Sequence, residues 1–292
     1  ARNAGTFTMR RVDDFRPVTT EELNRPDAAD WLNWRRTPDG HAHSPLIDIS
    51  RDNVSQLSMS WSMAMHEGSN QPTPLVRDGV MFLTHANNKI QAIEAATGEL
   101  LWEYQYAFPP ASKMLGGPTR NIALWQDRLF LATYDAAIVA IDAATGEERW
   151  RTEKADYREA FTHSAGPIVA NGMVVSGING CELFTQDGCF ITGHDPETGE
   201  ELWRTSTLAE PGTPEYASWG DVAPDRRGGG DIWIAGSYDP ELDLVYFGTS
   251  QPKPWAAPSR GMSVEDAALY TNATLAVRPK TGELVWHFQH IP

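Results

Sequence analysis

The stretch Ile138–Thr152, IVAIDAATGEERWRT, carries the pattern that decides the fold. A short β-forming run precedes an acidic residue and two turn residues. Thr-Gly-Glu follows, and then a second run that contains a Trp. The Gly suits a turn position with positive φ between antiparallel strands. The Trp can bury its large ring against a neighbouring unit.

The same pattern occurs again at three other places in the chain. The four units span Ile90–Tyr104, Ile138–Thr152, Ile191–Thr205 and Thr274–Phe288. Their first three turns lie about fifty residues apart, and a longer gap before the last turn indicates an insertion. A fifth Trp segment, around Trp61, lacks the preceding turn.

Strand–turn–strand patterns stand upstream of several of these units. They are TPLVRDGVMFLTH, IALWQDRLFLATY and PIVANGMVVSGIN. Together with the Trp units they predict four-stranded blades, which is the organisation of an all-β propeller. A generic β-sandwich is the alternative, but it gives no reason for a repeated Thr-Gly-Glu-x-x-Trp unit.

Composition excludes several classes of protein. The chain has 292 residues, a net charge of −15 and 41% hydrophobic residues, which is ample for a globular core. Because such an acidic surface repels phosphate backbones, we expect no nucleic-acid partner. The simpler interpretation of the negative charge is that it keeps the protein soluble. No run approaches the roughly 18 apolar residues of a membrane span. The start ARNAG fits a mature protein after signal removal or a cytosolic one.

The segments between the predicted blades resemble the pyrroloquinoline quinone (PQQ) dependent alcohol dehydrogenases. The resemblance runs from about Trp31 onward and is carried by DWLNWRRTPDGHAHSPLIDISRDNVSQLSMSW, GGGDIWIAGSYDPELDLVYFGTSQPKPW and ALYTNATLAVRPKTGELVWHFQHIP. The join GCFITGHDPETGEELWRTST is similar to a periplasmic subgroup that oxidises broad ranges of alcohols and sugars. The resemblance implies an eight-bladed propeller, periplasmic location, and hydride transfer from a primary or secondary alcohol or a sugar to PQQ.

An eight-bladed ring needs roughly four hundred residues, so this chain supplies about its N-terminal half. We expect about four blades plus opening strands over residues 1–292, with residues 1–29 as an N-terminal extension. A second chain or fragment is expected to complete the ring. No CxxCH haem-attachment motif occurs, so electrons are expected to leave to a separate acceptor such as a cytochrome c, or to a domain outside this sequence.

The resemblance also assigns candidate site residues. Trp233 matches the Trp on which the quinone stacks, and Arg120 matches the Arg that reaches its carbonyl and carboxylate oxygens. The simpler alternatives are that Trp233 docks one blade on another and that Arg120 is an ordinary surface residue. Weaker matches are Ser164, Asn179 and Gln71, and the adjoining Gly180 and Cys181 are also placed in the cofactor site.

A hard cation beside the quinone requires oxygen ligands. Glu182 matches the metal-binding Glu of the family, with a solvated loop Glu as the alternative. Gln251 stands where the family usually has Asn, and its amide oxygen can still bind calcium. Members that use lanthanides carry an additional acidic residue two positions after the catalytic Asp. Here that position is Ala268 or Leu269, so the expected metal is calcium.

The catalytic base is ambiguous in SVEDAALYTN. Counted without gaps, the family Asp falls on Ala267, and with one inserted residue it falls on Asp266. We favour Asp266, which would also be a metal ligand, because the connection looks one residue longer than usual. If the ungapped count is right, the chain has no base.

Both cysteines flank Glu182. In many family members adjacent cysteines form a ring over the quinone, but Met114 and Leu115 stand at the matching place. A bond between Cys181 and Cys189 is expected from the implied periplasmic compartment. Two free thiols remain the alternative, and zinc is disfavoured because there is no CxxC or His partner.

Two rival functions stay open. One is a non-catalytic propeller that scaffolds protein assembly and shares the Trp motif. The other is a degenerate quinoprotein that binds cofactor or substrate without turnover. Glu182, Trp233 and Arg120 favour the dehydrogenase, since a scaffold has no reason to hold all three.

Overall fold

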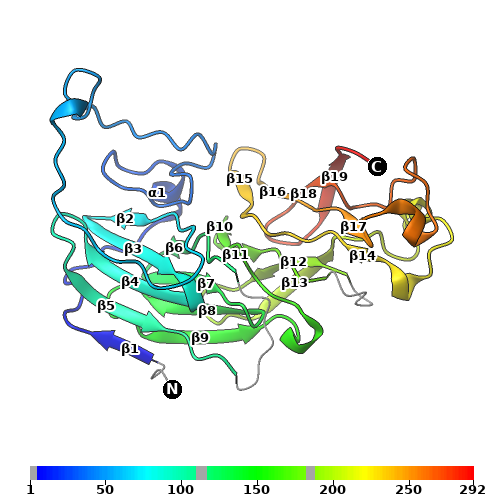
Figure 1. Ribbon diagram of the computed structural model, residues 1–292, viewed down its shortest axis with the longest axis horizontal. Coiled ribbons are helices and arrows are strands. Elements are labelled where there is room, and N and C mark those ends of the chain that lie inside the picture. The colour runs from blue at the N-terminus through cyan, green and yellow to red at the C-terminus, as the bar shows by residue number, and fades with distance from the viewer. Residues whose placement is uncertain (1–4, 110–116, 182–187) are drawn as a thin grey trace.

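A computed structural model describes residues 5–109, 117–181 and 188–292. Four antiparallel sheets of four or five strands follow one another along the chain, and the four strands that make up each blade lie in the order in which they occur in the sequence. Figure 1 shows these sheets side by side, with the described N-terminal strand at one edge and β19 near the other end. The chain is therefore part of a β-propeller, as the repeat predicts.

The strands of each blade are as follows. The first blade has β2 (Leu75–Arg77), β3 (Val80–His85), β4 (Lys89–Glu94) and β5 (Leu100–Gln105), and β1 (Gly5–Thr8) adds a fifth strand beside β5. The second has β6 (Ala123–Trp125), β7 (Arg128–Ala132), β8 (Ala137–Asp142) and β9 (Glu148–Glu153). The third has β10 (Ile168–Ala170), β11 (Met173–Ser176), β12 (Phe190–His194) and β13 (Glu201–Ser206), and the fourth has β15 (Ser237–Asp239), β16 (Leu244–Gly248), β18 (Ala273–Val277) and β19 (Leu284–Gln289).

Other elements are short. A two-stranded ribbon pairs β14 (Gly228–Gly229) with β17 (Pro252–Lys253). The one α-helix among the described residues is α1 (Thr20–Asn24), which begins with a capping box between Thr19 and Glu22. Short 3₁₀ segments span Val54–Gln56, Ala86–Asn88, Tyr157–Glu159, Pro214–Trp219, Pro224–Arg226 and Ala257–Arg260.

The blades pack through the repeated Trp, as the sequence predicts. Each of four indole N–H groups donates to a backbone carbonyl that lies three residues before the Gly of the next Thr-Gly-Glu turn. The pairs are Trp61 with Ala95 (3.0 Å), Trp102 with Ala143 (3.1 Å), Trp150 with Pro196 (3.0 Å) and Trp203 with Pro279 (2.8 Å).

The turn glycines are required by this docking. Gly199 has φ +78°, and a Cβ placed on it would lie 2.5 Å from the Trp150 ring. Gly98, Gly146 and Gly282 have φ between +74° and +78° and meet Trp61, Trp102 and Trp203 in the same way. Local backbone geometry and packing between blades therefore demand the same residue type.

The N-terminal residues pack against the first two blades. Besides the pairing of β1 with β5, Val18 bridges to Gln126 and Trp31 to Val76. The buried Arg77 donates to Asp30 at 2.8 Å and to Glu22 at 2.7 Å, so ionic contacts hold this segment as well.

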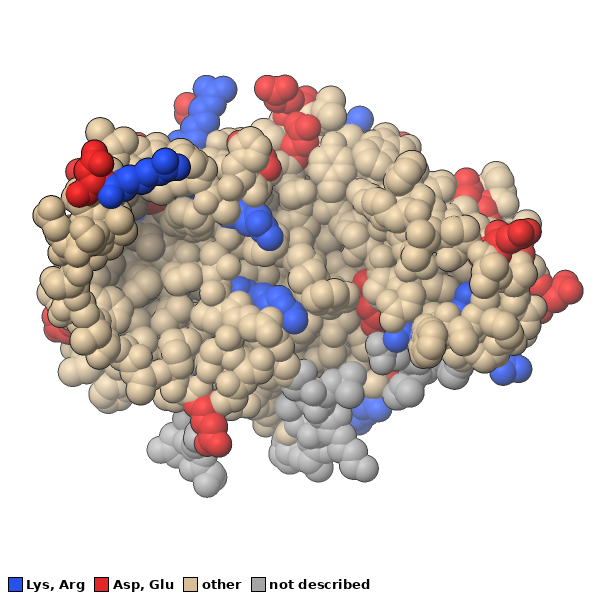
Figure 2. Space-filling view, turned by 45° about the horizontal axis from the view of Figure 1, so that its top comes forward, with Lys and Arg blue, Asp and Glu red and all other residues tan. Residues whose placement is uncertain are grey.

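The two ends of the blade series expose apolar side chains. Between Leu46 and Met65 they include Ile47 at 87% and Met59 at 80% exposure, and on β19 Phe288 is 62% exposed. Figure 2 shows acidic side chains mostly along the rim of one face rather than gathered in one patch. Within the described ranges, no helix is long and apolar enough to cross a bilayer.

Candidate cofactor site

A line of hydrogen bonds crosses the blades at one end. The N–H of Thr73 donates to the carbonyl of Arg120 at 3.0 Å, and the N–H of Arg120 donates to the carbonyl of Ser164 at 3.4 Å. The N–H of Ser164 then donates to Oδ1 of Asn179 at 3.1 Å. The segments before β2, β6 and β10 therefore meet the segment after β11. Three predicted cofactor residues become neighbours in this way.

Arg120 and Trp233 form the centre of the candidate site. Nη1 of Arg120 donates to the carbonyls of Ser164 at 3.1 Å and Trp233 at 3.4 Å. The guanidinium carbon lies 5.3 Å from the centre of the Trp233 ring, within cation–π range. The Trp233 side chain is 47% exposed, and none of the four blade-docking bonds uses it.

The charge of Arg120 is not compensated by a carboxylate among the described residues. Burial lowers the pKa of the guanidinium, yet an arginine stays charged at neutral pH. A cation held only by carbonyls beside an open indole plane fits a flat anionic ligand. The planar tricarboxylate PQQ has that chemistry, so the residues present fit the group that the resemblance implies.

The neighbouring turn, Asn179–Cys181, is tightly packed. Asn179 bridges to Thr162 through the backbone, and its side chain accepts from Ser164. A Cβ on Gly180 would lie 2.0 Å from the carbonyl oxygen of Ala160, and φ there is +92°. Only Gly fits at this position, which gives Gly180 a clear structural reason for its identity. Its predicted contact with the cofactor stays a prediction.

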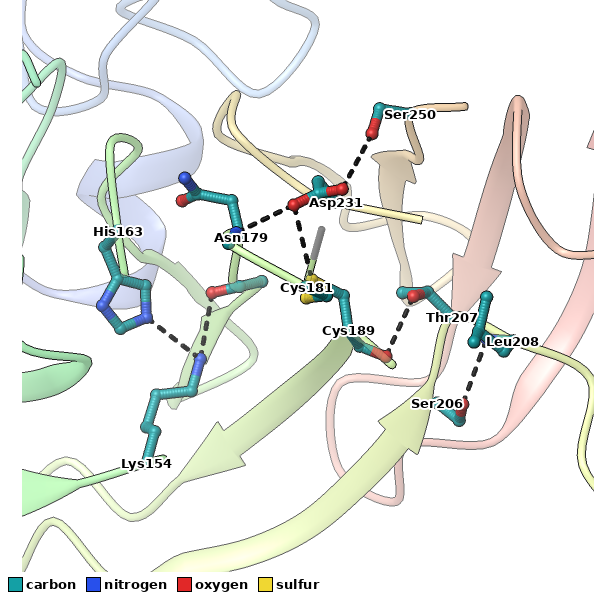
Figure 3. Close-up of a disulfide and its surroundings, with 12 residues drawn as sticks. Lys154, His163, Asn179, Cys181, Cys189, Ser206, Thr207, Leu208, Asp231 and Ser250 are labelled. Carbon is teal, nitrogen blue, oxygen red and sulfur yellow. Dashed lines mark hydrogen bonds between the residues drawn. A yellow bond between two sulfur atoms is a disulfide. The ribbon is translucent and has the colours of Figure 1, made fainter. Parts of the chain in front are cut away.

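The two cysteines form a disulfide, as expected from the implied compartment. Cys181 and Cys189 are bonded with their Cα atoms 5.4 Å apart, and both side chains are fully buried beside Ile178 and Phe190. Oxygen Oδ1 of Asp231 lies 3.8 Å from Sγ of Cys189 (Figure 3). Because the sulfur atoms are bonded to each other, this cluster is no thiolate metal site.

Three residues of the sequence assignment lie outside the described residues. These are the predicted metal ligand Glu182, and Met114 and Leu115 at the place of the family's cysteine pair. Their positions stay predictions.

The two predicted Gln residues are exposed at the edge of the site. Gln71 lies two residues before Thr73, which contacts Arg120. The carbonyl of Gln251 accepts from the N–H of Gly230 at 3.4 Å, which places its backbone near the Trp233 segment. The side-chain roles predicted for both residues stay predictions.

Asp266 lies in a local turn. Its Oδ2 accepts from the N–H of Ser263 at 2.6 Å. Among the described residues, no hydrogen bond or ion pair joins Asp266 to Arg120 or Trp233. The neighbouring Ala267 accepts from the side-chain amide of Gln289 through its carbonyl. The assignment of the base therefore stays a prediction.

Sequence reasoning missed two buried ionisable residues, Lys154 beside Ser176 and Gly177, and Asp231 beside Gly180. Nζ of Lys154 donates to the carbonyls of Ser176 at 3.1 Å and Gly177 at 3.0 Å and lies 3.4 Å from Nε2 of His163. Burial holds the pKa of Lys154 well below its usual range. Asp231 accepts from the N–H of Gly180 at 2.8 Å. The Asp in GGGDIW was visible in the sequence, but no pattern marked Lys154.

Comparison with known proteins identifies the family of this chain. The family model of the PQQ glucose/ethanol/alcohol dehydrogenase β-propeller domain matches residues 31–292. The quinohemoprotein alcohol dehydrogenase ADH-IIG of Pseudomonas putida is 33% identical over 96% of this chain and 40% of its own length. The dehydrogenase subunit of the quinone alcohol dehydrogenase of Gluconacetobacter polyoxogenes is 32% identical over 99% of this chain and 42% of its own length.

Solved structures show the same likeness. The structure of ADH-IIG from Pseudomonas putida HK5 superposes with a TM-score of 0.82 and 31% identity, over 95% of this chain and 43% of that one. A europium-containing methanol dehydrogenase also gives a TM-score of 0.82, at 25% identity, over 94% of this chain and 51% of that one. The present chain thus spans about half or less of the length of these relatives. Over that span, sequence and fold show that it belongs to the PQQ-dependent quinoprotein alcohol dehydrogenase family.

Proposed function

We propose that the protein is part of a quinoprotein dehydrogenase that oxidises primary or secondary alcohols or sugars to aldehydes or ketones. The pairing of Arg120 with the half-exposed Trp233 carries this proposal. These residues come from segments 113 positions apart in the chain. A scaffold propeller needs neither an uncompensated cation nor an open indole plane at this place.

The residues of this chain would bind and orient the cofactor. The Trp233 ring offers a flat surface for stacking, and Arg120 offers donors to a carboxylate or carbonyl oxygen. Ser164 and Asn179 border them and supply further polar groups. When bound, PQQ supplies the hydride acceptor, and a calcium ion supplies Lewis-acid polarisation. Glu182, Gln251 and Asp266 are the oxygen ligands we propose for calcium, and Asp266 is the proposed acceptor of the alcohol proton.

The proposal includes partners and a compartment. A complementary portion of the propeller would complete the ring, and a separate acceptor such as a cytochrome c would receive the electrons. The buried Cys181–Cys189 disulfide supports an oxidising compartment such as the periplasm.

Titration of the complete protein with PQQ tests the site, with quenching of tryptophan fluorescence as the readout. We expect Trp233→Leu to weaken PQQ binding about tenfold, because a stacked aromatic contact contributes about 1.4 kcal/mol. Trp255→Leu is the matched control, because Trp255 is 76% exposed. Equal affinity of the two variants would contradict the stacking role.

A quinoprotein without turnover is the second candidate. The observation that favours it is the placement of Asp266, whose carboxylate accepts a hydrogen bond from the N–H of Ser263 within its own turn. Turnover of an alcohol with PQQ, calcium and an artificial electron acceptor separates the two candidates. Turnover that Asp266→Asn abolishes supports the dehydrogenase, and PQQ binding without turnover supports the second candidate. Absence of PQQ binding would favour a scaffold.

A further inference from the structure

Asn121 directly follows Arg120, and its side chain joins the segment before β6 to the segment before β10. The residue is 1% exposed. Its Oδ1 accepts from the N–H of Gly166 at 2.7 Å, and its Nδ2 donates to the carbonyl of Pro167 at 3.1 Å. An asparagine amide carries one acceptor oxygen and two donor hydrogens, and here each end meets a backbone group of the opposite kind. The amide therefore fixes the course of the chain just after Ser164.

The two segments also approach each other very closely. A Cβ added to Gly166 would lie 1.9 Å from the backbone carbonyl oxygen of Asn121, so only glycine allows this contact. The N–H of Arg120 donates to the carbonyl of Ser164 at 3.4 Å, and Nη1 of Arg120 donates to the same carbonyl at 3.1 Å. Among the described residues, the bond from Gly166 to Asn121 is thus the shortest hydrogen bond between the two segments.

The residue on the other side of Arg120 is attached to the first blade. Thr119 is 3% exposed, and its carbonyl accepts from the hydroxyl of Thr84 at 2.9 Å. Its own hydroxyl accepts from Nδ2 of Asn88 at 2.9 Å. Arg120 is therefore flanked by two buried polar residues that are bonded to different parts of the propeller. Fixing the backbone on both sides of a long side chain reduces the conformational freedom that ligand binding must remove.

We propose that Asn121 is a positioning residue that fixes Arg120 relative to Ser164. This inference rests on the proposed function, in which both of those residues bind PQQ. Asn121 acts through the backbone of Gly166 and Pro167, because its buried amide is already bonded to these groups. The simpler alternative is that the amide only satisfies two buried backbone groups, as polar side chains in protein interiors commonly do.

A double-mutant cycle separates the two roles. Asn121→Ala removes both bonds, and we expect the PQQ affinity of the complete protein to fall about tenfold, because misplaced binding groups lose the benefit of preorganisation. Arg120→Ala removes the guanidinium itself. When Asn121→Ala is added to Arg120→Ala, we expect a further loss of less than about threefold, because residues that act together have non-additive effects. Quenching of tryptophan fluorescence measures each affinity.

Asn33→Ala is the matched control. Nδ2 of Asn33 donates to the carbonyls of Leu23 at 2.8 Å and Arg36 at 3.3 Å, so this substitution also removes two bonds to the backbone, but within the N-terminal segment. We expect its PQQ affinity to equal that of the wild type. If Asn121→Ala does not fold, Asn121→Asp takes its place in the cycle. Asp keeps an acceptor for Gly166 and loses the donor to Pro167, and we expect it to weaken binding about threefold or more.

Hydrogen exchange supplies a second readout that needs no cofactor. The N–H of Gly166 donates to the side chain of Asn121, and the next residue, Pro167, has no N–H. Exchange at Gly166 therefore reports on this bond. We expect its amide to exchange at least about tenfold faster in Asn121→Ala than in Asn33→Ala, because the bond that protects it is absent. Mass spectrometry of a peptide that covers residues 164–169, with fragmentation to single residues, measures both rates.

The outcomes separate failure of this inference from failure of the proposed function. Wild-type affinity in Asn121→Ala overturns the positioning role, and so does a full additional loss on the Arg120→Ala background. A loss in Asn33→Ala as large as that in Asn121→Ala also overturns it, because general destabilisation then explains the effect. If the wild type binds no PQQ, the proposed function fails. The exchange rates still test the structural contact, and equal rates at Gly166 in the two variants contradict it.

Discussion

At the scale of single residues, His194 shows how burial couples stability to pH. Its ring is fully buried in β12, where Nδ1 lies 3.1 Å from the carbonyl of Gly199 and Nε2 lies 2.9 Å from the hydroxyl of Thr192. Burial lowers the pKa of His194 to about 4, against an ordinary value of 6.5. The folded protein therefore resists a proton that the unfolded chain accepts.

The difference in the pKa of His194 between the folded and unfolded states makes the free energy of unfolding depend on pH. Well above pH 6.5 the histidine is neutral in both states, and its titration does not change the free energy of unfolding. As the pH falls from 6.5 toward 4, the unfolded chain gains a proton that the folded protein does not, so the free energy of unfolding decreases. A pKa difference of this size can lower the free energy of unfolding by about 3 kcal/mol at most.

We expect His194→Gln to reduce the loss of stability between pH 6.5 and 4, as measured by urea denaturation across that range. His41→Gln is the control, since the His41 side chain is 77% exposed. His85, whose pKa burial also lowers to about 4, will keep part of the slope in the variant. An unchanged slope in His194→Gln would contradict the role of this ring.

At the scale of elements, the Thr-Gly-Glu turn joins a backbone requirement to a packing requirement. Gly199 has φ +78°, and its missing Cβ leaves room for the Trp150 ring and for Oγ1 of Thr152. That hydroxyl donates to the carbonyl of Gly199 at 2.8 Å, so the β9 strand of one blade is attached to the next blade at this turn.

Gly199→Ala should lower the free energy of unfolding by about 3 kcal/mol. The positive φ accounts for about 1 kcal/mol and the displaced Trp150 for the remainder. Gly261→Ala is a matched control, because Gly261 has φ +74° with nothing within 4 Å of the added Cβ. Chemical denaturation of both variants measures the docking contribution as their difference. Equal destabilisation would show that docking contributes nothing at this turn.

At the scale of the whole molecule, Trp286 differs from the other Trp residues of the repeat, because its indole N–H makes no docking hydrogen bond among the described residues. Trp286 occupies the repeat position on β19, yet it is 42% exposed. The four Thr-Gly-Glu glycines in the sequence are already covered by Trp61, Trp102, Trp150 and Trp203. A second copy of this chain could receive Trp286 at such a turn only by displacing one of them, so the fitting partner is a different segment with a further glycine turn.

We predict that Trp286→Ala weakens association with the complementary portion of the propeller at least tenfold, measured by analytical ultracentrifugation of the two purified portions. Docking buries a large ring and gains one hydrogen bond, which accounts for a loss of that size. Trp255→Ala serves as the control, because Trp255 is exposed outside the repeat register. A closed ring made of two copies of this chain would contradict the glycine argument.

The blades and their order could be predicted from the sequence because their causes are local. A turn with positive φ needs Gly wherever it occurs, and the Trp follows it at a constant spacing, so each unit can be recognised by itself. The disulfide partners followed from the presence of only two cysteines and the implied compartment. Trp233 and Arg120 were assigned through resemblance, and no local pattern placed them together.

Only the tertiary structure decided which distant groups meet. Arg120 reaches Trp233 because the segment before β6 meets the segment after β14, where Nη1 of Arg120 donates to the carbonyl of Trp233. Lys154 donates to the carbonyls of Ser176 and Gly177, and Asp231 accepts from the N–H of Gly180. No local pattern predicts either residue, because a buried ionisable side chain is stabilised by whichever carbonyl, N–H or hydroxyl groups the fold places around it. Turn chemistry therefore determined the architecture, and the packing of the blades determined the site.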